Sequence, residues 1–136
     1  MRKPTILCVD DEVNGLLGRE ALLRQHGYEV VGTTSSQHSL DLLESAQVDA
    51  VILDYRMPEM MGDVLAARMK QLKPEVPIMM LSAYDALPPA ALRASDTFLS
   101  KSAPPNRFVD AVDDLLVARS PFFYRWWQNW KRRLSA

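Results

Sequence analysis

The sequence predicts an α/β fold: a doubly wound, five-stranded parallel sheet with helices on both faces and a C-terminal amphipathic helical extension. Short apolar runs alternate five times with segments in which apolar residues recur at helical spacing. The turns between them are short, which favours parallel strands joined by crossover helices. The run at 50–53 is too short for a buried helix and rich in β-branched residues, so it is typical of a strand covered on both faces.

The first half of the chain supplies two strands and two helices. An apolar run at 5–9 ends in an acidic turn, and a segment with helical periodicity follows it. Gly27 suits a left-handed cap that closes this helix. A second strand is expected at 28–31, and either Ser35 or Ser36 can cap the helix that follows.

The second half continues the alternation after the central strand. Gly62 begins a helix that prolines end before a strand at 78–81. Two more prolines, at 88–89, leave room only for a short helix before the fifth strand at 97–100. A clear amphipathic helix is expected over 108–116.

The expected topology brings the carboxyl ends of the strands together. Right-handed crossovers and the flavodoxin-like strand order 2-1-3-4-5 are the default for a chain of this size. In that order the first and third strands are neighbours, and open α/β sheets bind ligands where they meet. The residues that then converge are Asp10, Asp11, Asp54, Ser82 and Lys101.

Composition limits the class of protein. With 136 residues, of which 48% are hydrophobic and 24% charged, the chain can bury a core without disulfides or a structural metal. Its one cysteine, Cys8, lies in an expected strand and is interpreted as a core residue, which excludes a disulfide framework. No signal segment and no bilayer-length apolar run is present, so we expect a cytoplasmic protein.

Charge divides the chain into two parts. The formal net charge is −1, but the last 17 residues carry +4 and contain no acid. The remainder of the chain therefore carries −5. We accordingly expect a domain over 1–119 and a separate helical tail over 120–136.

The converging residues predict phosphoryl chemistry. Clustered carboxylates repel one another unless a cation neutralises them, and an all-oxygen set without His or Cys favours Mg²⁺. Asp54 ends the central strand and is the expected nucleophile, since an aspartate that attacks phosphorus forms an acyl phosphate. The Lys101 ammonium and the Ser82 hydroxyl are then placed to neutralise charge on the phosphoryl oxygens. The acidic first turn would repel a flavin mononucleotide phosphate, the other ligand considered for this fold.

Four motifs stand in a defined order and spacing. They are the turn Asp10-Asp11-Glu12, then Asp54 with Met57-Pro58 and Gly62 behind it, then Ser82-Ala83, and finally Lys101. Each motif is weak alone, but together they are highly specific. Over residues 4 to about 118 the chain resembles the receiver domain of bacterial two-component response regulators.

The resemblance implies a metal site and a phosphoacceptor. Asp10, Asp11, Asp54 and the backbone carbonyl of Arg56 would hold Mg²⁺. Asp54 would accept a phosphoryl group from a histidine kinase, a phosphotransfer protein or a small phosphodonor.

The resemblance also implies a switch. Ser82 would move toward the phosphoryl group, and Phe98 takes the place of the aromatic residue that follows it inward. Arg56 and Tyr84 would flank the path of a hydrolysing water and so affect the phosphoryl lifetime. Together with Phe98, the residues Arg56, Ala83 and Tyr84 are the expected switch and tuning positions.

The expected function is therefore that of a phosphoacceptor receiver in a phosphorelay. It is a self-phosphorylating and self-dephosphorylating switch, not a turnover enzyme, and phosphorylation shifts the surface seen by an output protein that the sequence does not name. An alternative stays open: a phosphorylation-independent receiver-like scaffold that acts through protein contacts or through membrane-surface binding by its tail.

The tail is expected to form a one-sided helix. Ser120-Pro121 is typical of an N-cap and a first helical residue. At roughly 100° per residue one face collects the residues Phe122, Phe123, Trp126, Trp127, Trp130 and Leu134. This face can pack on its own domain, form a protein or homodimer interface, or lie peripherally in the anionic inner membrane face. Direct DNA binding is not expected, because the domain is acidic and the tail is too short for a DNA-reading module.

Overall fold

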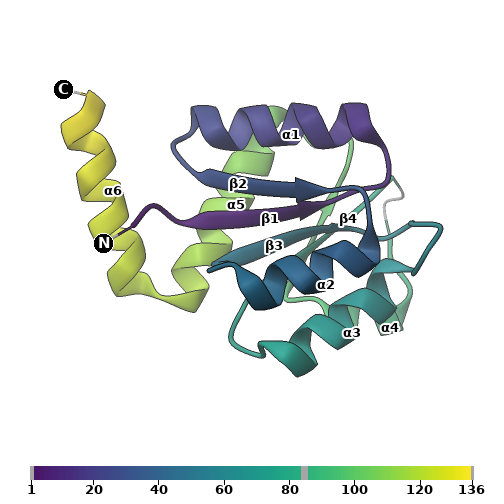
Figure 1. Cartoon of the computed structure of the whole chain (residues 1–136). Coiled ribbons are helices and arrows are strands. Elements are labelled where there is room, and N and C mark those ends of the chain that lie inside the picture. Colours follow the sequence, from purple (N-terminus) through teal and green to yellow (C-terminus); the bar gives the residue numbers. More distant parts are fainter. Residues whose placement is uncertain (1, 84–85, 136) are drawn as a thin grey trace.

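The protein folds into a parallel sheet between two layers of helices, with one further helix at the C-terminus (Figure 1). The computed structural model describes residues 2–83 and 86–135; within the last helix the side chains at 121, 123, 124, 130, 134 and 135 are not described. In chain order the elements are β1 (Thr5–Val9), α1 (Val13–Gln25), β2 (Glu29–Thr33), α2 (Ser36–Ser45), β3 (Ala50–Asp54), α3 (Gly62–Leu72), β4 (Ile78–Ser82), α4 (Pro89–Ala94), β5 (Thr97–Ser100), α5 (Pro105–Arg119) and α6 (Pro121–Ser135). Among the described helices, none combines the length and the apolar character needed to cross a bilayer.

The five strands run parallel in the order β2-β1-β3-β4-β5, which confirms the predicted topology. Val9 at the end of β1 pairs with Thr33 of β2 and with Leu53 of β3, and Leu53 pairs with Met80 of β4. The carboxyl ends of these strands are thus level with one another. Side chains that follow them are brought to one edge of the sheet.

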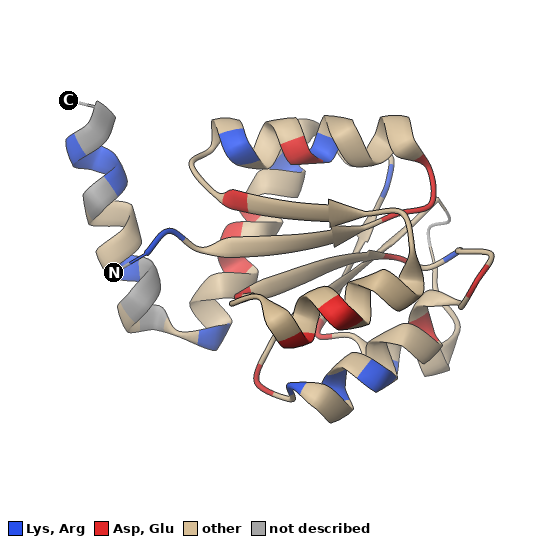
Figure 2. Ribbon diagram, in the orientation of Figure 1, with Lys and Arg blue, Asp and Glu red and all other residues tan. Residues whose placement is uncertain are grey.

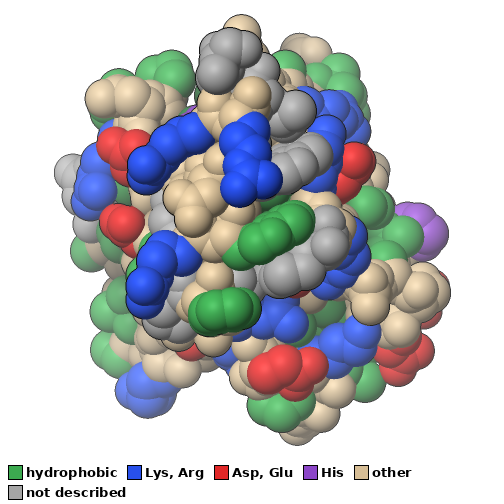
Figure 3. Space-filling model, turned by 90° about the vertical axis from the view of Figure 1, so that its left-hand side faces the viewer, with side chains coloured by type: hydrophobic (Ala, Val, Ile, Leu, Met, Phe, Trp, Pro, Cys, Tyr) green, Lys and Arg blue, Asp and Glu red, His purple; other side chains and the backbone are tan. Residues whose placement is uncertain are grey.

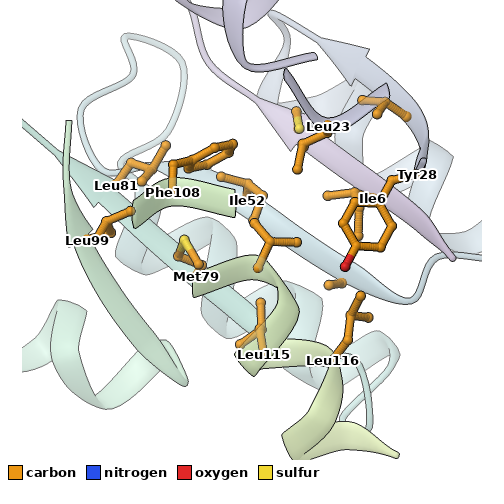
Figure 4. Close-up of a cluster of buried hydrophobic side chains, with 14 of the residues drawn as sticks. Ile6, Leu23, Tyr28, Ile52, Met79, Leu81, Leu99, Phe108, Leu115 and Leu116 are labelled. Carbon is orange, nitrogen blue, oxygen red and sulfur yellow. The ribbon is translucent and has the colours of Figure 1, made fainter. Parts of the chain in front are cut away.

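Alternation along the strands divides the core into two layers. Ile6 and Cys8 of β1 pack with α1 and α5, whereas Leu7 and Val9 pack with α2, α3 and α4. Figure 4 shows the first layer, in which Phe108 of α5 joins side chains of β3, β4 and β5. Burial on both faces explains why the strands are continuous apolar runs in the sequence.

Cys8 is a structural thiol. Its side chain is buried, and burial together with the negative charge of Glu20 raises its pKa from 9.0 to about 12. The thiol therefore stays protonated at neutral pH and is unreactive. The prediction that Cys8 belongs to the core is confirmed.

Several local signals have the predicted structural effect. Ser35 caps α2, accepting a hydrogen bond of 3.1 Å from the His38 N–H. Gly27 closes α1 with a positive φ of 103°, which Gly adopts without strain. The fourth helix, α4, has only six residues, as the prolines predicted. The second strand lies at Glu29–Thr33, later than the predicted 28–31, because its pairing with β1 continues to Thr33.

The tail forms a helix beside the amino ends of the strands, opposite the edge where the acidic residues converge (Figure 1). Trp127 is only 1% exposed and stacks on Tyr28, with ring centroids 6.1 Å apart. Gly27 leaves room for it, since a Cβ there would lie 3.1 Å from the indole Cζ2. Trp127 therefore packs on its own domain, which is the first of the three roles open to the aromatic face of the tail, and its ring is not available to a partner.

The other tail residues have different surroundings. Phe122 is 79% exposed and Trp126 is partly buried, whereas the side chains of Phe123, Trp130 and Leu134 lie outside the described part of the structure. On the side of the molecule that α6 occupies, Lys and Arg side chains gather on the surface (Figure 3). The exposed basic residues of α6 are Arg125, Arg132 and Arg133.

A polar cluster fixes α6 to the domain. The Lys131 Nζ lies 3.0 Å from His26 Nε2, which in turn lies 3.1 Å from Asp113 Oδ2. The Tyr28 hydroxyl donates a hydrogen bond to the other Asp113 oxygen. Burial lowers the pKa of Lys131, while the charge of Asp113 opposes this effect. The cluster joins the turn between α1 and β2 to α5 and α6 through side chains far apart in the sequence.

Candidate functional site

The acidic pocket lies at the carboxyl ends of β1 and β3. Val9 and Leu53 are paired across these neighbouring strands, so the next residues, Asp10 and Asp54, lie side by side. Both are nearly fully buried, whereas Asp11 is exposed. One carboxylate oxygen from each of the three lies within 4.8 Å of the others. The predicted convergence of the three acids is therefore observed.

Lys101 supplies a positive charge to this pocket. Its Nζ lies 3.1 Å from Asp10 Oδ2 and 3.1 Å from Asp54 Oδ2. The backbone places it there, since the Lys101 N–H donates a 2.7 Å hydrogen bond to the Ser82 carbonyl and so extends the pairing of β4 with β5. Lys101 thus joins the two buried acids, as predicted.

Arg19 is a second cation in the pocket, and it was not predicted. Its guanidinium donates to Asp10 Oδ2 from α1 and is 17% exposed. Gly15 lies one helical turn earlier, and a Cβ there would come 3.3 Å from Arg19 Nη2. A glycine one turn before an arginine, on the helix that follows the acidic turn, is the signal that points to this contact.

The electrostatic environment changes the acidity of Asp54. Burial, and then the charge of Asp10, raise the pKa of Asp54 from 3.8 to about 6, although Lys101 opposes this shift. Burial and the nearby Asp10 therefore raise the free energy of the charged form of Asp54. An added cation would lower this free energy.

The loop after β3 holds Asp54 in place. The Gly62 N–H donates a 2.7 Å hydrogen bond to the Tyr55 carbonyl, which closes the loop onto the start of α3. Met57 is buried in the core beneath the loop. The motif residues behind Asp54 therefore shape the backbone around it.

The other predicted site residues lie around the pocket. Ser82 is buried at the end of β4, next to the strand that carries Asp54. Phe98 is half-buried on β5 and lines a groove beside α5. Arg56 and Ala83 are exposed, and Tyr84 lies outside the described residues. Figure 2 shows acidic residues in the turn after β1, at the same end of the sheet as the pocket.

The donor set fits Mg²⁺. Its three carboxylates provide hard oxygen ligands, and no His or Cys belongs to this group. Asp11 is on the solvent side of the buried pair, which leaves space for the water ligands that Mg²⁺ usually keeps.

Comparison with known proteins identifies the family of the chain. The model of the response regulator receiver domain matches residues 6–113. The chain belongs to this family. The receiver domain is also similar to longer proteins. It is 33% identical over 131 residues to the transcriptional regulatory protein GlrR of Escherichia coli (strain K12), covering 93% of this chain and 30% of GlrR.

A second relative is also a longer protein that this chain matches only in part. The response regulator SaeR of Staphylococcus epidermidis (strain ATCC 12228 / FDA PCI 1200) is 31% identical over 119 residues, covering 85% of this chain and 51% of SaeR. The chain thus spans about half or less of the length of these two relatives.

Solved receiver structures have the same fold. A CheY-like receiver domain from Methanospirillum hungatei JF-1 superposes with a TM-score of 0.84 at 24% identity, covering 88% of this chain and 98% of that one. The response regulator TrrA of Thermotoga maritima, crystallised in complex with Mg²⁺-BeF, gives a TM-score of 0.78 at 30% identity. That match covers 83% of this chain and 99% of TrrA.

Proposed function

We propose that this receiver domain accepts a phosphoryl group on Asp54 in a two-component phosphorelay and requires Mg²⁺ to do so. The observation that carries the proposal is the Lys101 ammonium, 3.1 Å from both Asp10 and Asp54 in a pocket of three carboxylates. The Mg²⁺-BeF complex of TrrA, a similar protein, supports the choice of metal and of phosphoryl chemistry.

The positions of the side chains support the following phosphoryl transfer. A deprotonated Asp54 oxygen attacks phosphorus, and the bond from phosphorus to the donor breaks with its electron pair on the donor. The donor atom is an imidazole nitrogen of a histidine kinase or phosphotransfer protein, or the acyl oxygen of a small phosphodonor. Asp10, Asp11, Asp54 and the Arg56 carbonyl would hold Mg²⁺, which when bound would neutralise charge at the phosphoryl oxygens. Lys101 donates a hydrogen bond to one of these oxygens, which stabilises the negative charge that develops.

The proposed switch uses residues beside the pocket. Ser82 stands at the end of the neighbouring strand, and its hydroxyl would bond the new phosphoryl group. Phe98 is half-buried, so it can move further inward when Ser82 moves. Arg56 and Tyr84 then tune the lifetime of the phosphoryl group through access of water, and Ala83 is a further switch position.

We propose that the protein acts as a switch and not as a turnover enzyme. Its input partner is a histidine kinase or phosphotransfer protein, and its output partner reads the changed surface around Phe98. GlrR is named a transcriptional regulatory protein, and only 30% of its length corresponds to this chain. The output of the present protein is therefore proposed only as a protein contact.

Beryllofluoride, a mimic of the phosphoryl group, tests this function. With Mg²⁺ it should shift the NMR amide signals of Ala83, Phe98 and Lys101 in the wild type and leave them unchanged in Asp54→Asn. Wild-type signals that do not respond would contradict the phosphorylation switch and favour the phosphorylation-independent scaffold.

A further inference from the structure

We infer that Arg19 is an internal counter-ion that competes with Mg²⁺ for Asp10, so that Arg19 weakens Mg²⁺ binding while its guanidinium remains in the pocket. The inference rests on the proposed Mg²⁺ site and concerns a residue outside the motifs that the chain shares with its family. Two cationic side chains share one oxygen atom of Asp10. Asp10 Oδ2 accepts a hydrogen bond from the Arg19 guanidinium and also lies 3.1 Å from Lys101 Nζ.

Both oxygens of Asp10 are already engaged. Oδ1 accepts a 2.9 Å hydrogen bond from the Glu12 N–H, which fixes the turn after β1. Oδ2 receives two cationic donors, Arg19 and Lys101. Each carboxylate oxygen has two lone pairs in its plane, so the two donors fill Oδ2 and only one position, on Oδ1, is left for a metal. Departure of Arg19 would free a second position, on Oδ2.

The charges in the pocket favour the same exchange. Arg19 and Lys101 leave one negative charge uncompensated among Asp10, Asp11 and Asp54. If a divalent cation were added while Arg19 and Lys101 both stayed, this partly buried group of side chains and metal would carry a net positive charge. If Mg²⁺ replaces Arg19, the group becomes neutral instead. Since charges are poorly screened in a buried site, exchange is more favourable than addition.

A cavity beside Arg19 can accept its side chain when the guanidinium leaves Asp10. It lines a partly open cavity of about 240 Å³ between α1 and the loop after β5, together with Gly15, Gly18 and Lys101. Glu12 offers an alternative partner, because its Oε2 and Arg19 Nη2 both lie 3.3 Å from the point that a Cβ on residue 15 would occupy. The guanidinium can thus leave Asp10 by side-chain rotation and remain near a carboxylate.

The test compares two arginines of the same helix. Arg19→Met removes the competitor, whereas Arg24→Met removes an equal charge from an arginine that pairs with Glu20 at 3.3 Å and is 55% exposed. The Mg²⁺ dissociation constant is measured by isothermal titration calorimetry on each full chain, and circular dichroism verifies the fold. We expect Mg²⁺ to bind about tenfold more tightly to Arg19→Met and within about twofold of wild type to Arg24→Met. Arg19→Gln, which keeps a polar side chain, should also bind more tightly and serves if Arg19→Met does not fold.

The outcomes separate this inference from the proposed function. Wild-type binding with no gain in either Arg19 variant, or with equal gains in the Arg24 control, would overturn the competition and leave the Mg²⁺ site standing. Absence of Mg²⁺ binding in every protein would overturn both.

Discussion

The carbonyl oxygen of Asp54 lies 2.6 Å from the position that a Cβ atom would take on residue 62. Gly62→Ala would therefore force the backbone next to the phosphoacceptor to move, and flexible side chains alone cannot relieve the contact. We expect a loss of about 2 kcal/mol or more in the free energy of unfolding. Urea denaturation of the purified variant measures it.

Gly18→Ala is the matched control for Gly62→Ala. A Cβ at Gly18 meets no atom within 4 Å, and the position is in the interior of α1. This substitution should be neutral or stabilise the protein by up to about 1 kcal/mol, because alanine favours helix. Equal effects of the two substitutions would contradict the close approach of the loop at Gly62.

Asp54→Asn should change how stability depends on pH. Because burial and the nearby Asp10 raise the pKa of Asp54 from 3.8 to about 6, the folded protein favours the protonated acid. The stability that the protonated Asp54 contributes is fully present below pH 3.8 and is lost as the pH rises through about 6. In the presence of a chelator, Asp54→Asn should be more stable than wild type at pH 7.5 by on the order of 1 to 2 kcal/mol. This gain should decrease as the pH falls from 6 toward 4.

Asp49→Asn provides the contrast for that measurement. Asp49 is also a buried aspartate of the β3 region, but it pairs with Arg2 at 2.6 Å and with Arg119 at 2.8 Å and accepts the Thr5 N–H. Removing its charge should destabilise the protein at pH 7.5. A gain for Asp54→Asn that is the same at every pH would show that charge burial is not its cause.

Trp127→Ala tests whether the tail is part of the domain. Its indole is fully enclosed by Tyr28 and its neighbours, so truncation should cost about 3 kcal/mol in the free energy of unfolding. Phe122→Ala removes another aromatic ring of α6, one that is 79% exposed, and should cost less than about 0.5 kcal/mol. Denaturation of both variants measures the difference. If Trp127→Ala leaves stability unchanged but alters the mass in size-exclusion chromatography, the helix serves association instead.

Lys101→Ala should keep the fold and slow phosphorylation. The ammonium is 22% exposed and stabilises charge at the phosphoryl oxygens in the proposed mechanism, so its loss should slow modification by acetyl phosphate roughly a hundredfold. Lys70→Ala removes another lysine, which pairs with Asp96 at 2.6 Å away from the pocket, and should leave the rate unchanged. Time courses on a phosphate-affinity gel give both rates. Similar rates for the two variants would remove Lys101 from the mechanism.

The sequence predicted the sheet and the acidic pocket because their signals are local. Buried parallel strands are continuous apolar runs, and the acids and Lys101 follow those runs directly, so strand order alone brings them together. Arg19 and Trp127 could not be placed in this way. Arg19 reaches Asp10 through a long side chain that passes Gly15, and Trp127 is buried because Gly27, one hundred residues earlier, leaves space for its ring. Both contacts depend on tertiary packing.

The most direct test of the account is the intact mass of the protein after incubation with acetyl phosphate and Mg²⁺. The wild type should gain the mass of one phosphoryl group, and Asp54→Asn should gain none. Asp49→Asn, if folded, should still be modified, because its carboxylate is held by Arg2 and Arg119 at the other end of β3. An unchanged wild-type mass with several phosphodonors, or modification that persists in Asp54→Asn, would contradict the assignment of Asp54 as the phosphoacceptor.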